Sequence, residues 1–260
     1  MVIIALLTDF GTKDYFVGAM KGAILYVNEN VHLIDITHEI EPQNIKSAGF
    51  NLHACYKDFL VGTIFVAVVD PGVGSARRAI LVETEDYFFI APDNGLLSFV
   101  FNESEDFRVF ELTNREFFAH HISTTFHGRD VFAPVAAHLS KGVKPSEFGR
   151  EITDFVRFEE NKPRKISENE IEAEIIEIDR FGNLITNLKR EDLPEQFTLE
   201  IGETRVEKLR RFFAESEPRE IFMIFGSAGF LEIAAFQDSA KNLLRAETGQ
   251  KILVKMVKIL

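Results

Sequence analysis

The sequence predicts an α/β protein in two parts: an N-terminal Rossmann-like α/β domain and a C-terminal, mainly antiparallel β-barrel-like domain. Through the first half, short apolar runs alternate with helical periodicity, which is typical of a parallel sheet covered by helices. Residues 159–170, EENKPRKISENE, are dominated by charged and polar side chains and are the best linker candidate. Beyond them, short strand-like runs are separated by Gly, Pro and charged turns. We therefore predict domains at 1–160 and 171–260.

Each element of the first domain has its own signal. Apolar runs predict buried strands at 2–7, 32–36 and 63–69, and a hairpin or neighbouring strands at 79–84 and 87–91. Residues 16–27 repeat apolar side chains at helical spacing. A second helix is expected over 129–142, where Pro134 fits only near the start and Gly142 suits the end.

The pattern of the second domain predicts mostly strands. The runs with partial apolar alternation lie at 171–178, 197–201, 221–225, 230–236 and 252–259. Between them, RVEKLRRFFAE, residues 205–215, is the one segment for which the pattern predicts a helix.

Charge and composition exclude several classes of partner. The 260 residues include 29 Lys plus Arg and 41 Asp plus Glu, a net charge of −12, which repels nucleic acid and anionic lipid. No apolar run approaches the ~20 residues that a bilayer span needs, so no membrane partner is expected. The only cysteine, Cys55, cannot form an internal disulfide, and residues 1–7 do not resemble a signal peptide. We expect a cytoplasmic protein.

The stretch VVDPGVGSARR, residues 68–78, places an aspartate at the end of an apolar strand. In open α/β sheets, ligands bind outside the carboxyl ends of strands, so Asp70 faces the expected crevice. Arg77 or Arg78 can return to pair with it and hold it ionised. The alternative is an ordinary Asp-Pro-Gly turn followed by surface arginines.

Asp9, in TDFG, ends the first strand in the same way. Two strand-end carboxylates in one crevice would suit a diol such as a ribose. The alternative role for Asp9 is capping the following helix. Its loop lacks the GxGxxG pattern of a dinucleotide site.

TFHGRD, residues 125–130, places His127 and Gly128 just before a helix, where backbone N–H groups can meet a ligand. A structural or exposed histidine is the alternative. DITHEI, residues 35–40, places Asp35 and His38 at another strand end, and a metal site that combines them with His127 is a further alternative. Without HExxH or paired cysteines, we expect no metal.

Two segments of the second half have binding character. DRFGNLITN, residues 179–187, combines an aromatic ring with amides, as a flat ring such as adenine needs, although a hairpin turn explains it equally. GSAGFLEIA, residues 226–234, has backbone amides that could hold a carboxylate, or is only a turn.

Taken together and in order, TDFG, KGAIL, DITHEI, VVDPGVGSARR, APDNGLL, TFHGRDVFAPVAAHL, DRFGNLITN and GSAGFLEIA resemble the S-adenosyl-L-methionine (SAM) hydroxide adenosyltransferases, relatives of the SAM-dependent fluorinase and chlorinase. The resemblance runs from Thr8 to about Ala240. It implies a homotrimer with active sites between subunits, no cofactor, and attack of water or hydroxide on C5′ of SAM to give adenosine and L-methionine. A sulfonium leaves as a neutral thioether, so such a site needs groups that orient and activate water.

The resemblance also implies roles for individual residues. The catalytic set maps to Asp70, Arg77 and His127, and either Asp70 or His127 is the base. The residues matched to substrate binding are Asp9 for the ribose, Asp14, Asp179, Ser227 and Glu232 for the methionine end, and Phe126, Phe181, Asn183 and Phe213 for the sugar and base.

Two departures from the halogenases favour hydrolysis. Asp70 stands where the fluorinase has a tyrosine, and Gly128, in the substrate-binding region, stands where it has a halide-contacting serine. An ionised carboxylate repels a halide. The remaining alternatives are a non-catalytic SAM or adenosine sensor, a SAM-dependent halogenase, and a metal-dependent hydrolase built on Asp35, His38 and His127.

Overall fold

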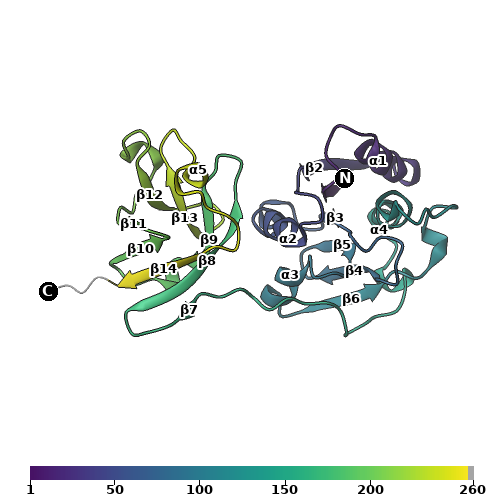
Figure 1. Ribbon diagram of the computed structural model, residues 1–260. Coiled ribbons are helices and arrows are strands. Elements are labelled where there is room, and N and C mark those ends of the chain that lie inside the picture. The colour runs from purple at the N-terminus through teal and green to yellow at the C-terminus, as the bar shows by residue number, and fades with distance from the viewer. Residues whose placement is uncertain (257–260) are drawn as a thin grey trace. The chain divides into compact units, whose positions relative to one another are not determined.

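A computed structural model describes residues 1–256 of the chain, which forms two compact units (Figure 1). The first unit spans Met1–Glu160 and contains a mixed sheet with helices on both faces. The second unit begins at Asn161 and contains a nearly closed, barrel-like antiparallel sheet. The predicted fold class is confirmed.

The sheet of the first unit has the strand order β2-β1-β3-β5-β4-β6. Its strands are β1 Val2–Thr8, β2 Val31–Thr37, β3 Ile64–Val68, β4 Ala79–Thr84, β5 Phe88–Pro92 and β6 Phe107–Glu111. Strands β2, β1, β3 and β5 are parallel, whereas β4 pairs antiparallel with β5 and β6. Because Thr8 pairs with Val68, the residues that follow β1 and β3 leave the sheet at the same edge.

The helices α1 to α4 cover the two faces of this sheet (Figure 1). Helices α1 (Phe16–Val27) and α4 (Ala133–Ser140) pack on one face, and α2 (Ile45–His53) and α3 (Ser98–Glu103) on the other. The apolar face of α1 buries Met20 and Ile24 completely, as its helical periodicity predicts. Helix α2, which the apolar pattern does not reveal, begins at a side-chain cap, where Asn44 accepts from the N–H of Ser47.

The entry to α4 is irregular. A π-helical turn, η3 (Gly128–Phe132), precedes the helix, and such turns are frequent at functional sites. Pro134 lies in the first turn of α4, and Gly142 follows its end with φ 90°, both as predicted. The short 3₁₀ turns of this unit are η1 Tyr56–Asp58, η2 Arg115–Phe117 and η4 Pro145–Glu147.

The second unit is a barrel-like sheet of the order β11-β10-β14-β8-β9-β13-β12, with β7 beside β8. Its strands are β7 Arg164–Lys165, β8 Glu170–Ile178, β9 Leu184–Lys189, β10 Phe197–Ile201, β11 Thr204–Val206, β12 Ile221–Phe225, β13 Phe230–Ala235 and β14 Lys251–Met256; the remaining elements are η5 Arg190–Asp192, η6 Phe213–Glu215 and α5 Ala240–Leu244. Strand β7 lies inside the segment expected as a linker. Of the run predicted at 252–259, residues 257–259 lie outside the described part.

The predicted helix at 205–215 is wrong. This segment continues from β11 along β12, where Met223 donates to the carbonyl of Lys208 and accepts from the N–H of Arg210. Leu209 forms a bridge with Met223 in the same place. These backbone bonds close the gap between the end strands of the sheet, and this tertiary pairing overrides a local pattern that favours a helix.

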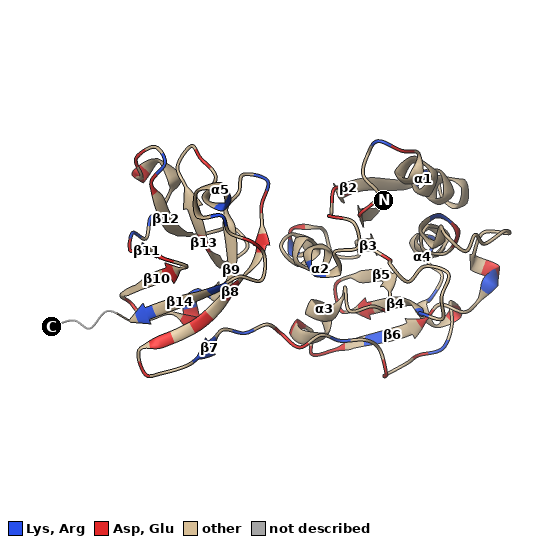
Figure 2. Cartoon of the chain, viewed as in Figure 1, with Lys and Arg blue, Asp and Glu red and all other residues tan. Residues whose placement is uncertain are grey.

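Charged residues are spread over both units. In Figure 2, short blue segments alternate with red ones in each unit instead of gathering on one element. Between residues 1 and 256, no helix has the length and apolar character that crossing a membrane requires.

Glu103, at the end of α3, connects three side chains of the α2–η1 region. It accepts hydrogen bonds from His53 Nε2 at 2.7 Å, Tyr56 Oη at 3.0 Å and Lys57 Nζ at 2.9 Å. Burial opposes ionisation of Glu103, but the bonds from Lys57, His53 and Tyr56 outweigh it and lower its pKa from 4.5 to about 2. The ionised form therefore stabilises the first unit.

Replacing Glu103 with Gln should lower the free energy of unfolding at pH 7. A carboxyl whose pKa is depressed by folding stabilises the protein above its unfolded pKa, and this contribution is lost as the pH falls through the folded pKa. The difference between the wild type and Glu103→Gln should therefore shrink between pH 4.5 and about 2. Urea unfolding at several pH values measures it, and a difference that is constant with pH would contradict the role assigned to Glu103.

Candidate active site

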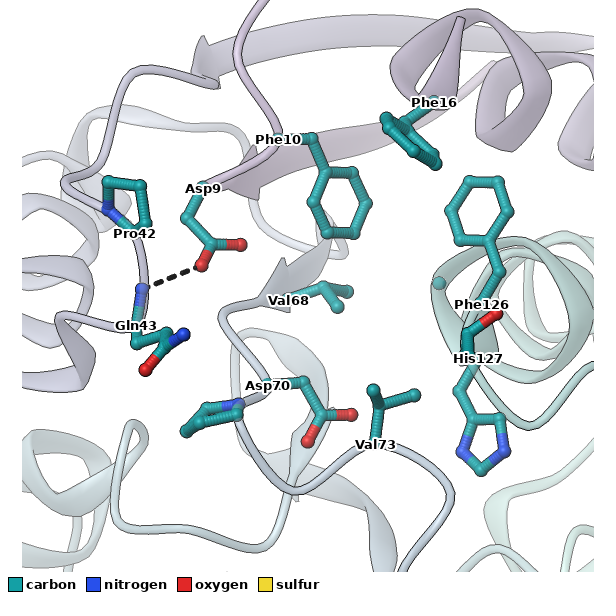
Figure 3. Close-up of a pocket in the computed structure, with 13 residues that line it drawn as sticks. Asp9, Phe10, Phe16, Pro42, Gln43, Val68, Asp70, Val73, Phe126 and His127 are labelled. Carbon is teal, nitrogen blue, oxygen red and sulfur yellow. Dashed lines mark hydrogen bonds between the residues drawn. The ribbon is translucent and has the colours of Figure 1, made fainter. Parts of the chain in front are cut away.

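A pocket of about 430 Å³ opens at the carboxyl edge of the first unit's sheet (Figure 3). Asp9, after β1, and Asp70, after β3, both point their carboxylates into it. The other side is formed by Phe126 and His127, from the loop before α4. The parallel register of β1 and β3 explains why carboxylates 61 positions apart (70 minus 9) share one pocket.

Asp9 has one oxygen engaged. Its Oδ2 accepts from the backbone N–H of Gln43 at 2.9 Å, as the dashed line in Figure 3 shows. Gln43 has a left-handed backbone, φ 69°, in the turn that presents this N–H, a conformation that is rare outside glycine. The sequence does not reveal Gln43 as a site residue, because only the folded chain brings its backbone N–H to Asp9.

Asp70 and Arg77 form a buried ion pair. Arg77 Nε lies 2.9 Å from Oδ1 and 3.0 Å from Oδ2 of Asp70, and Arg77 Nη2 also donates to Oδ2. Only 5% of the Asp70 side chain and 11% of the Arg77 side chain are exposed. The guanidinium also lies over the ring of Phe132, 5.3 Å from its centre. Of the two arginines considered, Arg77 pairs with Asp70, whereas Arg78 binds Asp93 and Asp154.

Arg77 also joins Asp70 to His127. Its Nη2 lies 2.8 Å from His127 Nδ1. A guanidinium only donates, so Nδ1 accepts and the ring hydrogen of neutral His127 lies on Nε2. Burial and the charge of Arg77 lower the pKa of His127 below 6.5, although Asp70 and Asp130 act in the opposite direction. His127 is therefore a neutral donor near pH 7.

Asp130 fixes the loop that carries His127. Only 2% of the Asp130 side chain is exposed. Its Oδ2 accepts from the N–H of Ser123 at 2.8 Å, and Arg129 donates to both of its carboxylate oxygens. Arg129 also lies over the ring of Phe126, 5.0 Å from its centre. Asp130 stands in the TFHGRD segment, but nothing in the sequence distinguishes its inward side chain from a surface aspartate.

Aromatic rings form the apolar side of the pocket. Phe10, Phe16 and Phe126 lie with their ring centres 5.2–5.9 Å apart. Gly128 lies against this group, since an added Cβ would be 3.1 Å from Met20 Sδ and 3.3 Å from Phe10. A side chain at position 128 would require Met20 and Phe10 to shift by a few tenths of an ångström.

Three predicted site residues lie apart from the pocket. Asp14 is exposed and is not among the residues that line it. Asp35 and His38 contact each other, with 3.0 Å between Oδ1 and Nε2, and Lys21 binds Asp35, whereas His127 is bound to Arg77. Across residues 1–256, no three His, Cys, Asp or Glu side chains are gathered as a metal site would need.

The predicted residues of the second unit lie in two turns, except Glu232 in β13 and Phe213 in η6. In the first, between β8 and β9, Asp179 Oδ1 accepts from the N–H groups of Phe181 and Asn183, and its Oδ2 accepts from the Asn183 amide at 2.8 Å. Asn183 is 5% exposed, whereas the Phe181 ring is 76% exposed. The segment 179–187 therefore contains a turn between two strands, as the hairpin-turn alternative predicts, and the side chain of Phe181 lies at the surface.

The second turn joins β12 and β13 and carries Ser227. Glu232 of β13 packs against Gly226, where an added Cβ would lie 1.7 Å from Oε1. Burial, and then the charge of Asp179, raises the pKa of Glu232 to about 7. Phe213, in η6, packs edge-on against Phe222 at 5.5 Å and is 40% exposed.

Comparison with known proteins gives one consistent family. Residues 4–149 match the family model of the SAM hydroxide adenosyltransferase N-terminal domain, and residues 173–253 match that of the C-terminal domain. A protein named (R)-S-adenosyl-L-methionine hydrolase from Methanocaldococcus jannaschii is 36% identical, with 94% of this chain and 92% of that protein covered. One of the same name from Thermus thermophilus is 34% identical, with 95% and 96% covered.

More distant and structural relatives agree. A protein named fluorinase from an Actinoplanes species is 30% identical, over 74% of this chain and 73% of that protein. The crystal structure of an uncharacterised conserved protein from Thermotoga maritima matches with a TM-score of 0.89 and 34% identity. The match covers 98% of this chain and 100% of the Thermotoga chain.

Replacing Arg77 with Met should destabilise the first unit by about 3 kcal/mol, because it leaves the buried Asp70 carboxylate without a partner. Methionine keeps apolar contact with Phe132, so the loss reports mainly on charge. Urea unfolding measures the cost. The double variant Asp70→Asn/Arg77→Met should lose less than the sum of the single variants, and strictly additive losses would show that the pair is not coupled.

Proposed function

This chain belongs to the SAM hydroxide adenosyltransferase family, and we propose that it hydrolyses SAM to adenosine and L-methionine by attack of water at C5′. The observation that carries this proposal is the Asp70–Arg77–His127 group, which combines a fixed carboxylate with a neutral histidine at the wall of one pocket. The two hydrolases cited above support it, since each is aligned over more than nine-tenths of its length.

We assign Asp70 as the group that takes the proton from water. His127 Nδ1 is already bonded to Arg77 and Nε2 carries the hydrogen, so neither nitrogen is free to accept a proton. Asp70 retains carboxylate lone pairs beside those used by Arg77, and it faces the pocket. His127 then donates through Nε2–H and orients the water.

The reaction balances with these residues alone. A water lone pair forms the C5′–O bond while the C5′–S bond breaks. The electron pair of the C5′–S bond goes to the sulfur, which leaves as the neutral thioether of methionine. The proton lost by water passes to Asp70 and then to solvent. No group is needed to protonate the leaving sulfur, which is why we expect no cofactor.

The remaining contacts are extensions of the same proposal. We assign Asp9 to the ribose hydroxyls, Phe126 and Asn183 to the sugar and base, and Asp179, Ser227 and Glu232 to the methionine end. A homotrimer, in which a neighbouring subunit supplies the second-unit residues, stays a prediction, as does a cytoplasmic location. The exposed rings of Phe181 and Phe213 suit a surface that is covered in an assembly.

Halide transfer is the competing activity because fluorinases are among the relatives. At this site a halide would meet the carboxylate of Asp70, and Gly128 offers no hydroxyl. Both features disfavour an anionic nucleophile and leave neutral water as the better one. A sensor that binds without turnover would not require the three-residue group.

Turnover in ¹⁸O-labelled water tests the proposal. Purified protein, freed of bound nucleoside, should convert SAM to methionine and to adenosine that carries one heavy oxygen, as measured by mass spectrometry. Asp70→Ala and His127→Ala should each lower kcat by at least about 100-fold and retain adenosine binding, because each removes water activation and leaves the ribose contact. Asp9→Ala should act mainly on KM.

Each alternative has its own result. Tight SAM binding without turnover would replace the hydrolase with a sensor. Full activity of both Asp70→Ala and His127→Ala would remove the water-activation assignment. Loss of activity with a chelator would indicate a metal-dependent hydrolase.

A further inference from the structure

DITHEI has no role in the proposed reaction, yet its histidine lies behind the pocket. His38 is 4% exposed and Thr8, the last residue of β1, is fully buried. Thr8 Oγ1 and His38 Nδ1 are 2.8 Å apart. A buried side-chain contact directly before Asp9 needs an explanation beyond strand packing, because valine fits a buried strand position without a hydroxyl group.

His38 bonds to the chain both before and after Asp9. Before Asp9, the Thr8 hydroxyl bonds the His38 ring, and the same oxygen accepts from the N–H of Phe10 at 3.2 Å. After Asp9, the N–H of Gly11 donates to the carbonyl of His38 at 2.7 Å. The backbone of residues 8–11 is thus attached to His38 at both ends.

A further pair orients the ring of His38. Nε2 lies 3.0 Å from Asp35 Oδ1, near enough for electrostatic attraction but off the line of a well-directed hydrogen bond. Lys21 of α1 binds the other Asp35 oxygen at 2.6 Å. A carboxylate attracts a ring hydrogen and repels a ring lone pair, so the hydrogen of a neutral His38 ring lies on Nε2 beside Asp35. Nδ1 is left to accept from the Thr8 hydroxyl.

We propose that Thr8 and His38 are positioning residues that hold the Asp9 carboxylate for a ligand carrying a vicinal diol. The N–H of Gln43 fixes Oδ2 from one side, and the Thr8–His38 contact fixes the backbone from the other. The other carboxylate oxygen, Oδ1, points into the pocket that Asp9 lines (Figure 3). This inference rests on the proposed function, since it takes adenosine as a ligand of this pocket.

The test compares two ligands that differ only in the diol. For each variant, calorimetry of the full-length protein gives the Kd of adenosine and of 2′,3′-dideoxyadenosine. Thr8→Val has the same shape but no hydroxyl. It should weaken adenosine binding by about tenfold, the worth of about one hydrogen bond between Asp9 and the diol, and leave dideoxyadenosine unchanged. In turnover of SAM, it should raise KM and leave kcat within about twofold.

Three further variants separate positioning from stability. Thr8→Ser restores the hydroxyl and should restore adenosine binding. His38→Asn places an amide near the position of Nδ1 and should retain more adenosine binding than His38→Gln, whose amide lies near Nε2. Glu103→Gln, which lowers stability in the same unit and contacts no residue from 8 to 11, should leave the ratio of the two Kd values unchanged.

Equal weakening of both ligands by Thr8→Val, or no weakening of either, would overturn the positioning role. Failure of the proposed function looks different. A wild-type protein that neither hydrolyses SAM nor prefers adenosine over dideoxyadenosine would remove the diol ligand itself, and this inference with it.

Discussion

The hydrogen bonds of Arg77 connect the two groups to which we assign the chemistry, Asp70 and His127. One guanidinium donates to both oxygens of Asp70 and to Nδ1 of His127, and it is held over the ring of Phe132. Burial and the nearby positive charge of Arg77 disfavour a second cation on the histidine. A buried pair of this kind contributes little net stability, so its value lies in fixing which group accepts and which donates.

The sheet supplies the second constraint. Parallel strands β1 and β3 end side by side, so the chain places Asp9 and Asp70 in one pocket without any long-range interaction between the two side chains. The residues that complete the pocket come from elements packed around this edge: Gln43 before α2, and Phe126 and His127 before α4. Each of these loops has an anchor of its own, Asn44 for the first and Asp130 for the second.

Much of this arrangement is encoded locally. Continuous apolar runs identified β1, β2 and β3. The position of Asp70 after such a run made Arg77 and Arg78 its candidate partners, and only the fold shows that Arg77 forms the ion pair. What could not be read locally depends on partners distant in sequence. Residues 205–215 look helical but bond to Met223, Gln43 presents a backbone group rather than a side chain, and Asp130 is distinguished only by its burial. The nitrogen of His127 that Arg77 binds likewise follows from the fold alone.

Nitrogen-15 NMR of His127 at neutral pH tests whether this histidine is a neutral donor beside Asp70, since it reports both the charge of the ring and the nitrogen that carries the hydrogen. We expect a neutral ring with its hydrogen on Nε2 and a pKa below 6.5. The pKa should be higher in Arg77→Met, where the neighbouring positive charge is gone. An imidazolium at pH 7, or a neutral ring with its hydrogen on Nδ1, would contradict the assignment of Asp70 as acceptor and His127 as donor.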